Sequence, residues 1–332
     1  MNKFLQWSLS LVLFAYFGWD FYKKMAEHSD QLTLIKKDAF ELWPVFLLVS
    51  VLFFLAMVLR AHRWALILGD GRLLWLSYRS IAIGYLVQCP LSKLGEFARM
   101  ANQKKQSNLG MGQIVSTIFV DRLLDVFSLL VVLIATAALS QGLMEENFPQ
   151  LSGLLPKLVG MMCFGLLGLI FSLVFQKSIL SRLEHWTFIP RSVVRVFSHF
   201  VAQFSLGLVH CKRWQTMVYL LFSNALVWLL YFICFYATFV FFPQIPATIT
   251  LSEYFFVFAI GSLGALVPVP GGLPYPLFTQ QALVLVCPEL DESVAFSISL
   301  VMYLINFWLV NLLCGGSAWL LQMLAPAKKV KA

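Results

Sequence analysis

The sequence predicts an all-α integral membrane protein with about six spanning helices and two re-entrant helical hairpins. Of its 332 residues, 60% are hydrophobic and only 12% are charged, well below the roughly 25% charged residues of soluble domains. Apolar runs close to the ~20 residues needed to cross a bilayer recur along the chain. Two of the apolar regions are broken by polar or Pro-Gly segments that a continuous membrane helix does not tolerate.

The six predicted spans cover residues 4–22, 43–59, 113–139, 154–175, 216–242 and 294–324. Positive charge predicts their orientation, because cytoplasmic loops are enriched in lysine and arginine. Arg60 and Arg63 follow the second span and Lys328 follows the last, whereas loop 140–153 carries only acidic charge. We therefore expect a single domain over residues 1–332 in the inner (cytoplasmic) membrane, with both termini in the cytoplasm.

The basic segment 176–213 is predicted to be cytoplasmic. Within it, apolar residues recur at roughly helical period over 193–210. This pattern indicates either an amphipathic helix on the membrane surface or a loop helix packed on the bundle.

Residues 89–99, CPLSKLGEFAR, form a polar break between apolar runs. Because polar groups are costly in lipid, we interpret this break as the tip and returning arm of a re-entrant hairpin that enters from the cytoplasm. Lys93, Glu96 and Arg99 recur at helical spacing on the returning arm. The N-terminal end of that arm, together with Lys93, favours an anion such as a lipid phosphate.

A second break, residues 267–276 (VPVPGGLPYP), includes Pro268, Pro270, Gly271 and Gly272. An unbroken helix cannot pass through these residues. We predict a second re-entrant hairpin that enters from outside, with a plain extracellular turn as the alternative. Two hairpins of opposite entry are typical of an inverted repeat, and their tips are expected to line a cavity near the membrane midplane.

A further charged group, Asp121, Arg122 and Asp125, lies in the first turns of span 113–139. Arginine can bind phosphate or carboxylate through bidentate contacts, which Arg99 and Arg122 could supply. Glu96 and the two aspartates would then neutralise these cations in the empty site or contact a cationic headgroup. The alternative is a structural ion-pair cluster at the cytoplasmic interface.

Other classes of site are not indicated. The six cysteines contain no C-x-x-C pair and the five histidines lack metal-ligand spacing, so we expect no metal and no cofactor. The net charge of +8 is spread over loops, which favours anionic lipid over nucleic acid. No nucleophile–base set or nucleotide motif is evident, and we expect no enzymatic activity.

Three short elements carry a family resemblance. They are Pro90, Lys93, Gly95, Glu96 and Arg99; then Asp121, Arg122 and Asp125; then Pro268, Pro270, Gly271, Gly272 and Leu273. They are similar to the P-x-R-x-G-E-x-x-R, E-R-x-x-D and P-x-P-G-G-L-G signatures of the flippase-like membrane domain of bacterial lysylphosphatidylglycerol synthases. In the first signature, Lys93 stands in place of the first arginine, and the chain has one more residue between Pro90 and this base than the family has. In the second signature, Asp121 replaces the glutamate.

The resemblance also has departures. Pro274 stands where the family usually has glycine, and Leu277 stands near the expected position of a glutamate. The resemblance implies two re-entrant hairpins and movement of a phospholipid or polyprenyl-linked lipid between leaflets. The aminoacyl-transferase domain of the full synthases is absent from this sequence, so we expect no synthesis of aminoacyl lipid.

The leading hypothesis is a lipid translocase for a membrane lipid with an anionic headgroup. Its predicted substrate site comprises Lys93, Glu96, Arg99, Asp121, Arg122, Asp125, Pro268, Pro270, Gly271 and Gly272. One alternative is a membrane-embedded transferase or hydrolase with Glu96 or Asp121 as general base. The other is a non-transporting partner of a lipid-modifying enzyme.

Overall fold

The computed structural model describes residues 43–89, 94–139, 213–267 and 269–324, with single positions at 19, 23, 157, 160, 202, 206 and 209. All regular structure in these residues is helical, as predicted. Apart from the single positions, the predicted spans 4–22 and 154–175 and the amphipathic segment 193–210 lie outside the described residues.

Three helices of the described chain are long and apolar enough to cross a membrane: Trp43–Ile67, Trp214–Val240 and Glu292–Leu320. The first is α3 and the second is α11 (Trp214–Val240). The third runs through α14 (Glu292–Tyr303), the π-helical turn η4 (Leu304–Leu309) and into α15 (Val310–Leu324). Helix α6 (Met111–Leu139) coincides with the predicted span 113–139.

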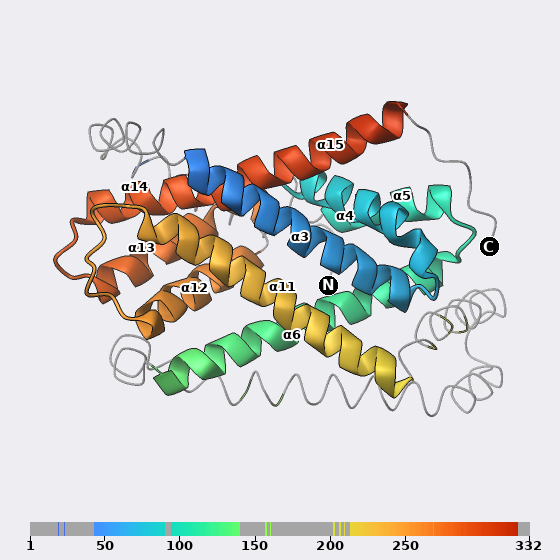
Figure 1. Cartoon of the computed structure of the whole chain (residues 1–332), viewed down its shortest axis with the longest axis horizontal. Helices are drawn as coiled ribbons and strands as arrows, with labels where there is room; N and C mark the ends of the chain where they lie inside the picture. The colour runs from blue at the N-terminus through green and yellow to red at the C-terminus, as the bar shows by residue number, and fades with distance from the viewer. Residues whose placement is uncertain are drawn as a thin grey trace, which may run out of the picture.

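Two antiparallel helix pairs lie between these long helices, toward opposite ends of the molecule (Figure 1). The first helix pair is α4 (Leu74–Gln88), preceded by the short turn η1 (Gly71–Leu73), with α5 (Leu94–Gln106). The second helix pair is α12 (Leu251–Leu266) with α13 (Pro274–Val286), and the short turn η3 (Pro270–Gly272) lies between them. A capping box between Thr250 and Glu253 starts α12 by satisfying its first backbone donors.

Glycines allow the arms of both helix pairs to approach closely. A methyl group on Gly95 would lie 2.5 Å from the backbone oxygen of Gly84, across the first helix pair. A methyl group on Gly264 would lie 2.6 Å from the backbone oxygen of Pro274, across the second. Both contacts require the absence of a Cβ atom, so both pairs depend on glycine for their close packing.

The Pro-Gly-Gly turn of the second helix pair requires glycine for a different reason. Gly271 and Gly272 have φ values of +77° and +69°, a region that side chains strongly disfavour. The hydroxyl of Tyr303 donates to the backbone oxygen of Gly271, and the ring of Phe307 lies against Gly272. Phe307 lies within the π-helical turn η4. This irregular turn of the last long helix therefore packs against the Pro-Gly-Gly break of the second helix pair.

The contacts between elements follow a crossed pattern. Helix α3 packs against α11, α4 packs against α15, and α12 packs against α6. Each helix pair therefore contacts the long helix that follows the other pair along the chain. This arrangement places the two pairs on either side of a shared interior.

One prediction is wrong. The second span was expected to end at residue 59, with Arg60 and Arg63 in a cytoplasmic flank. Helix α3 instead continues to Ile67 and buries both arginine side chains. The extension is possible because carboxylates of α6 pair with both guanidinium groups. A buried charge is tolerated when it is paired and hydrogen-bonded.

Candidate functional site: an arginine cluster beside a cavity

Four arginines and three carboxylates from three helices form one ion-pair cluster. Its members are Arg60 and Arg63 of α3, Glu96 and Arg99 of α5, and Asp121, Arg122 and Asp125 of α6. Residues 121 and 125 lie four apart on α6, so their side chains share one helix face. The arginines outnumber the carboxylates by one, so the cluster carries an excess positive charge.

Asp121 is the centre of the buried part of this cluster. Its side chain has no exposed surface, and its carboxylate accepts from Arg60 at 3.3 Å, from Arg99 at 2.9 Å and from Arg63. The guanidinium of Arg99 also stacks on the ring of Trp64, with its central carbon 3.9 Å from the ring centroid. Asp121 therefore joins α3, α5 and α6 through ionic contacts.

Asp125 and Glu96 bind the outer arginines of the cluster. Asp125 accepts from Arg60 at 2.6 Å and from Arg122 at 3.2 Å, and it lies 3.5 Å from Arg63. Glu96 pairs with Arg122 and lies 3.7 Å from Arg99. Arg122 is 40% exposed, much more than the other three arginines, and is the cluster member best placed to meet a ligand.

Helix α11 contributes two uncharged partners. Asn224 accepts from Arg63 and donates to the backbone oxygen of Leu124 at 2.8 Å. The hydroxyl of Tyr231 accepts from Arg60 at 3.3 Å. The long helix that precedes the second helix pair is thereby connected to the arginine cluster.

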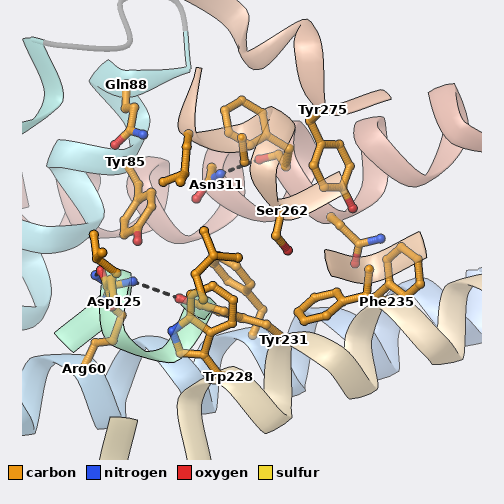
Figure 2. A pocket seen from close by; sticks show the side chains of 18 of the residues that line it. Arg60, Tyr85, Gln88, Asp125, Trp228, Tyr231, Phe235, Ser262, Tyr275 and Asn311 are labelled. Carbon is orange, nitrogen blue, oxygen red and sulfur yellow. Dashed lines mark hydrogen bonds and ion pairs between the residues drawn. The ribbon is translucent and has the colours of Figure 1, made fainter. Parts of the chain in front are cut away.

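A cavity of about 290 Å³ extends from this cluster into the interior of the bundle. Figure 2 shows Arg60, Tyr85, Gln88 and Asp125 on one side of it, and Phe235 and Tyr275 on the other. The remaining wall is mostly aromatic and aliphatic. The lining residues are Phe53, Arg60, Tyr85, Gln88, Arg122, Asp125, Val126, Leu129, Trp228, Tyr231, Phe235, Phe258, Ser262, Ala265, Leu266, Tyr275, Asn306, Phe307 and Asn311.

The two sides of the cavity differ in charge. Arg60, Arg122 and Asp125 give one side two positive charges and one negative charge. The other polar side chains of the lining are all uncharged, namely Tyr85, Gln88, Trp228, Tyr231, Ser262, Tyr275, Asn306 and Asn311. The residues come from both helix pairs and from the long helices, so the cavity occupies the shared interior between the pairs.

An apolar groove lies next to the cavity, between α6, α11 and α12. Its volume is about 340 Å³, and Trp228 and Phe258 line both the groove and the cavity. Phe127, Val131, Leu221 and Leu229 form other parts of its wall and are all exposed hydrophobic side chains. The groove is therefore an apolar surface that adjoins the charged cavity.

The structure separates the predicted site residues. Arg122 and Asp125 line the cavity, whereas Asp121 is buried beneath them. Glu96 and Arg99 line a small recess of about 10 Å³ between α4, α5 and α6, room for about one water molecule. The recess adjoins the cavity, since Tyr85, Gln88 and Arg122 line both. Arg99 is thus committed to Asp121 and Trp64 and does not line the cavity.

The predicted Pro-Gly residues lie beside the cavity. Gly271 and Gly272 contact Tyr303 and Phe307, and Phe307 in turn lines the cavity. Pro270 begins η3. Lys93 and Pro268 lie outside the described residues.

Several site residues were missed by sequence reasoning. Arg60 and Arg63 were assigned to the cytoplasmic flank, although their spacing of three places both on one face of a helix. Tyr231, Asn306 and Asn311 lie in apolar runs with no local motif. For Asn306 and Asn311, the available signal was an amide within a predicted span, because polar residues at membrane depth are commonly functional.

Within the described residues, no group of three or more histidine, cysteine, aspartate or glutamate side chains is arranged to hold a metal ion. The four cysteines of the described chain, Cys89, Cys234, Cys287 and Cys314, are buried and unpaired. They pack as small apolar residues.

The chain matches one protein-family model, described as the lysylphosphatidylglycerol synthase TM region, over residues 5–314. No curated protein and no solved structure matches it. The match covers nearly all of the sequence and includes every residue of the cluster and of the cavity lining. The chain therefore belongs to the lysylphosphatidylglycerol synthase transmembrane-region family.

Proposed function

We propose that this protein is a lipid translocase that moves an anionic phospholipid or a polyprenyl-phosphate-linked lipid between the leaflets of the inner membrane. The observation that carries the proposal is the cavity between the two helix pairs, with the guanidinium groups of Arg60 and Arg122 in its wall. A phosphate is a suitable ligand for such groups, because arginine binds phosphate oxygens through paired hydrogen bonds.

The adjoining groove supports a lipid as the substrate. A headgroup in the cavity leaves its acyl or prenyl chains in need of an apolar surface, since apolar chains are driven out of water. Trp228 and Phe258 connect the cavity to a groove with exposed hydrophobic walls. In the proposed complex, the chains lie along this groove while the headgroup occupies the cavity.

The lengths of the helix pairs support re-entrant hairpins. Their arms contain 15, 13, 16 and 13 residues, and at 1.5 Å per residue the longest is about 24 Å, shorter than the ~30 Å hydrocarbon core. The crossed contacts between the pairs and the long helices are those expected of an inverted repeat. In this proposal the first pair enters from the cytoplasm, the second enters from outside, and both chain termini are cytoplasmic.

The proposal involves binding and movement without a covalent step. The headgroup enters from the inner leaflet, binds beside Arg60 and Arg122, and passes the break at Gly271 and Gly272 toward the outer side. Rocking of one repeat against the other would expose the cavity to each leaflet in turn. The irregular backbone of η3 and η4 is where such movement would be concentrated, since π-helical turns are frequent at functional sites.

A reconstitution experiment tests the proposal. The purified full chain is placed in liposomes containing a trace of phosphatidylglycerol with a fluorescent acyl chain, and dithionite is added outside to quench the exposed label. We expect a protein-dependent increase in the quenched fraction, because translocation brings inner-leaflet lipid to the outer surface. If several anionic headgroups give the same quenched fraction as protein-free liposomes, the translocase proposal is wrong.

The same liposomes address the enzymatic alternative. A membrane-embedded transferase or hydrolase would produce a new lipid species that mass spectrometry detects, and Glu96→Gln would abolish its formation. A translocase leaves the lipid composition unchanged. A non-transporting partner would give neither a new lipid nor a change in quenching.

A further inference from the structure

The lining of the cavity includes uncharged polar groups that the protein leaves unpaired. The hydroxyl groups of Ser262 and Tyr275 make no hydrogen bond within the part of the chain that the structure describes. The side-chain oxygens of Asn306 and Asn311 are buried and also lack a hydrogen-bond partner there. Asn311 is only 3% exposed. Two unpaired acceptors and two free hydroxyl groups therefore line the cavity.

Buried unpaired acceptors are costly and call for a donor. Asn306 already donates both of its amide N–H groups, to Met302 and Thr238, and Asn311 donates one of its two to Phe307. Both carbonyl oxygens and the second N–H of Asn311 are thus available to a ligand. An alcohol O–H supplies the missing donor, and its oxygen can accept in turn from Ser262 or Tyr275.

The charged side of the cavity argues against a cationic ligand group. Asp125 is the one carboxylate among the described lining residues, and Arg60, Arg63 and Arg122 already surround it. An ammonium group would compete with three guanidinium groups for that carboxylate. It would also enter a low-dielectric site of excess positive charge, where like charges repel strongly.

Aromatic rings separate the two sides. Figure 2 shows Trp228 and Tyr231 between Arg60 and Phe235, and Phe258 also lines the cavity. Their apolar faces suit the C–H faces of a polyol or a sugar ring, while its hydroxyl groups reach the asparagines. A ligand that matches all three zones carries a negative phosphate at one end and several uncharged hydroxyl groups at the other.

We propose that the cavity selects a phosphodiester headgroup that ends in an uncharged polyhydroxyl group, such as glycerol, inositol or a sugar. This inference rests on the proposed function, because it names the headgroup class of the same site. The phosphodiester lies beside Arg60 and Arg122. The hydroxyl groups lie beside Ser262, Tyr275, Asn306 and Asn311. Headgroups without hydroxyl groups, or with a terminal ammonium, bind more weakly.

A binding measurement tests the headgroup class separately from transport. The full chain in detergent is titrated with dihexanoyl phosphatidylglycerol, dihexanoyl phosphatidylmethanol and dihexanoyl phosphatidylethanolamine, with affinity measured by calorimetry. Phosphatidylmethanol keeps the phosphodiester charge and lacks the polyol, so it isolates the contribution of the hydroxyl groups. We expect phosphatidylglycerol to bind at least about tenfold more tightly than either analogue, because each hydrogen bond to an otherwise unpaired group contributes a few-fold in affinity.

Two variants connect the selectivity to the cavity. Tyr275→Phe and Ser262→Ala are each expected to weaken phosphatidylglycerol binding by about fivefold, the loss of one hydrogen bond, and to leave phosphatidylmethanol binding unchanged. Tyr236→Phe is the matched control, since it removes a tyrosine hydroxyl from α11 at an exposed position outside the cavity lining. It should change neither affinity.

The outcomes separate the inference from the proposed function. Equal affinity for phosphatidylglycerol and phosphatidylmethanol, tighter binding of phosphatidylethanolamine, or an equal effect of Tyr275→Phe on both anionic lipids would overturn the headgroup assignment, even if lipid moves in liposomes. Selective phosphatidylglycerol binding without movement would overturn the translocase proposal and support the assignment. Free sn-glycerol 3-phosphate that binds as tightly as the lipid would support the polyol phosphate chemistry and assign it to a soluble ligand.

Discussion

The first and second helix pairs are built alike and carry different polar groups. Both pairs close through glycine contacts, Gly84 with Gly95 in one and Gly264 with Pro274 in the other. The first pair contributes Glu96 and Arg99 to a charged cluster whose members are paired with one another. The second pair contributes Ser262 and Tyr275, which are uncharged and unpaired within the described residues. Similar packing thus supports two different environments at the two sides of one cavity.

The difference has a consequence for the role of each pair. Charges in the first pair stabilise the packing of α3, α5 and α6, because each carboxylate contacts at least two guanidinium groups. Hydroxyl groups in the second pair contribute little to packing and are available to a ligand. Substitutions in the two regions should therefore have separable effects on stability and on ligand movement.

The largest effect is expected at Asp121. Asp121→Ala leaves Arg63 and Arg99 buried without their main carboxylate partner, and removal of one partner of a buried ion pair costs about 3–5 kcal/mol. We expect a large fall in the thermal midpoint of the detergent-solubilised protein. Glu289→Gln, at an exposed loop position, is the control and should leave the midpoint unchanged. An unchanged midpoint in Asp121→Ala would show that the cluster does not hold the helices together.

Arg122 is expected to affect transport more than stability. Its side chain is 40% exposed and lines the cavity, so Arg122→Gln removes a charge-assisted contact worth about 1.5–3 kcal/mol, or roughly 10- to 100-fold in lipid binding. The quenching rate in liposomes measures the effect.

Arg79→Gln is the matched control for Arg122→Gln. Arg79 lies outside the ion-pair cluster and donates to the backbone oxygen of Trp75. This variant should transport at the wild-type rate. Equal quenching rates for Arg122→Gln and Arg79→Gln would show that Arg122 does not contribute to lipid binding.

Glycine substitutions compare the packing of the two helix pairs directly. In Gly95→Ala and Gly264→Ala, the new methyl group would lie 2.5 Å and 2.6 Å from backbone oxygens, and overpacking of this kind costs about 1–3 kcal/mol. Both variants should lower the thermal midpoint by similar amounts. Gly316→Ala meets no atom within 4 Å in a helix, and should raise the midpoint slightly. A lower thermal midpoint in only one of the two variants would contradict the conclusion that both helix pairs depend on a close glycine contact.

The smallest effect is expected in the apolar groove. Ala225→Trp places a large ring in a groove of about 340 Å³, and should slow lipid movement about threefold to tenfold if the chains lie there, a loss of roughly 1 kcal/mol of chain contact. Phe222→Trp is the control, because Phe222 is 67% exposed on the same helix and does not line the groove. Equal transport by the two variants would place the chains elsewhere.

The sequence predicted the helices better than the contacts between them. The helices over 113–139 and 216–242 were located by the length of their apolar runs, and the break at Pro270, Gly271 and Gly272 was located because proline and glycine restrict the backbone. The end of the span 43–59 was placed too early, because Arg60 and Arg63 resemble a cytoplasmic flank when their partners are unknown. Local composition does not reveal that a carboxylate some 60 residues away neutralises them.

The candidate site was predicted in part. Asp121, Arg122 and Asp125 form one group with Glu96 and Arg99, as both the ligand hypothesis and the ion-pair hypothesis required. The sequence could not predict which of them faces the cavity. Arg99 stacks on Trp64, whereas Arg122 lines the cavity. The contributions of Tyr231 and Asn306 depend on the packing of helices distant in sequence, which no local pattern specifies.

The most direct test of the account is chemical blockage of the cavity between the two helix pairs. Ser262→Cys introduces a thiol into the cavity wall, and a charged methanethiosulfonate reagent then adds a bulky cation there. Translocation of fluorescent phosphatidylglycerol should stop in the labelled Ser262→Cys protein, and should continue in wild type and in Gly316→Cys treated in the same way. Undiminished translocation by fully labelled Ser262→Cys protein would show that lipid headgroups do not pass through this cavity.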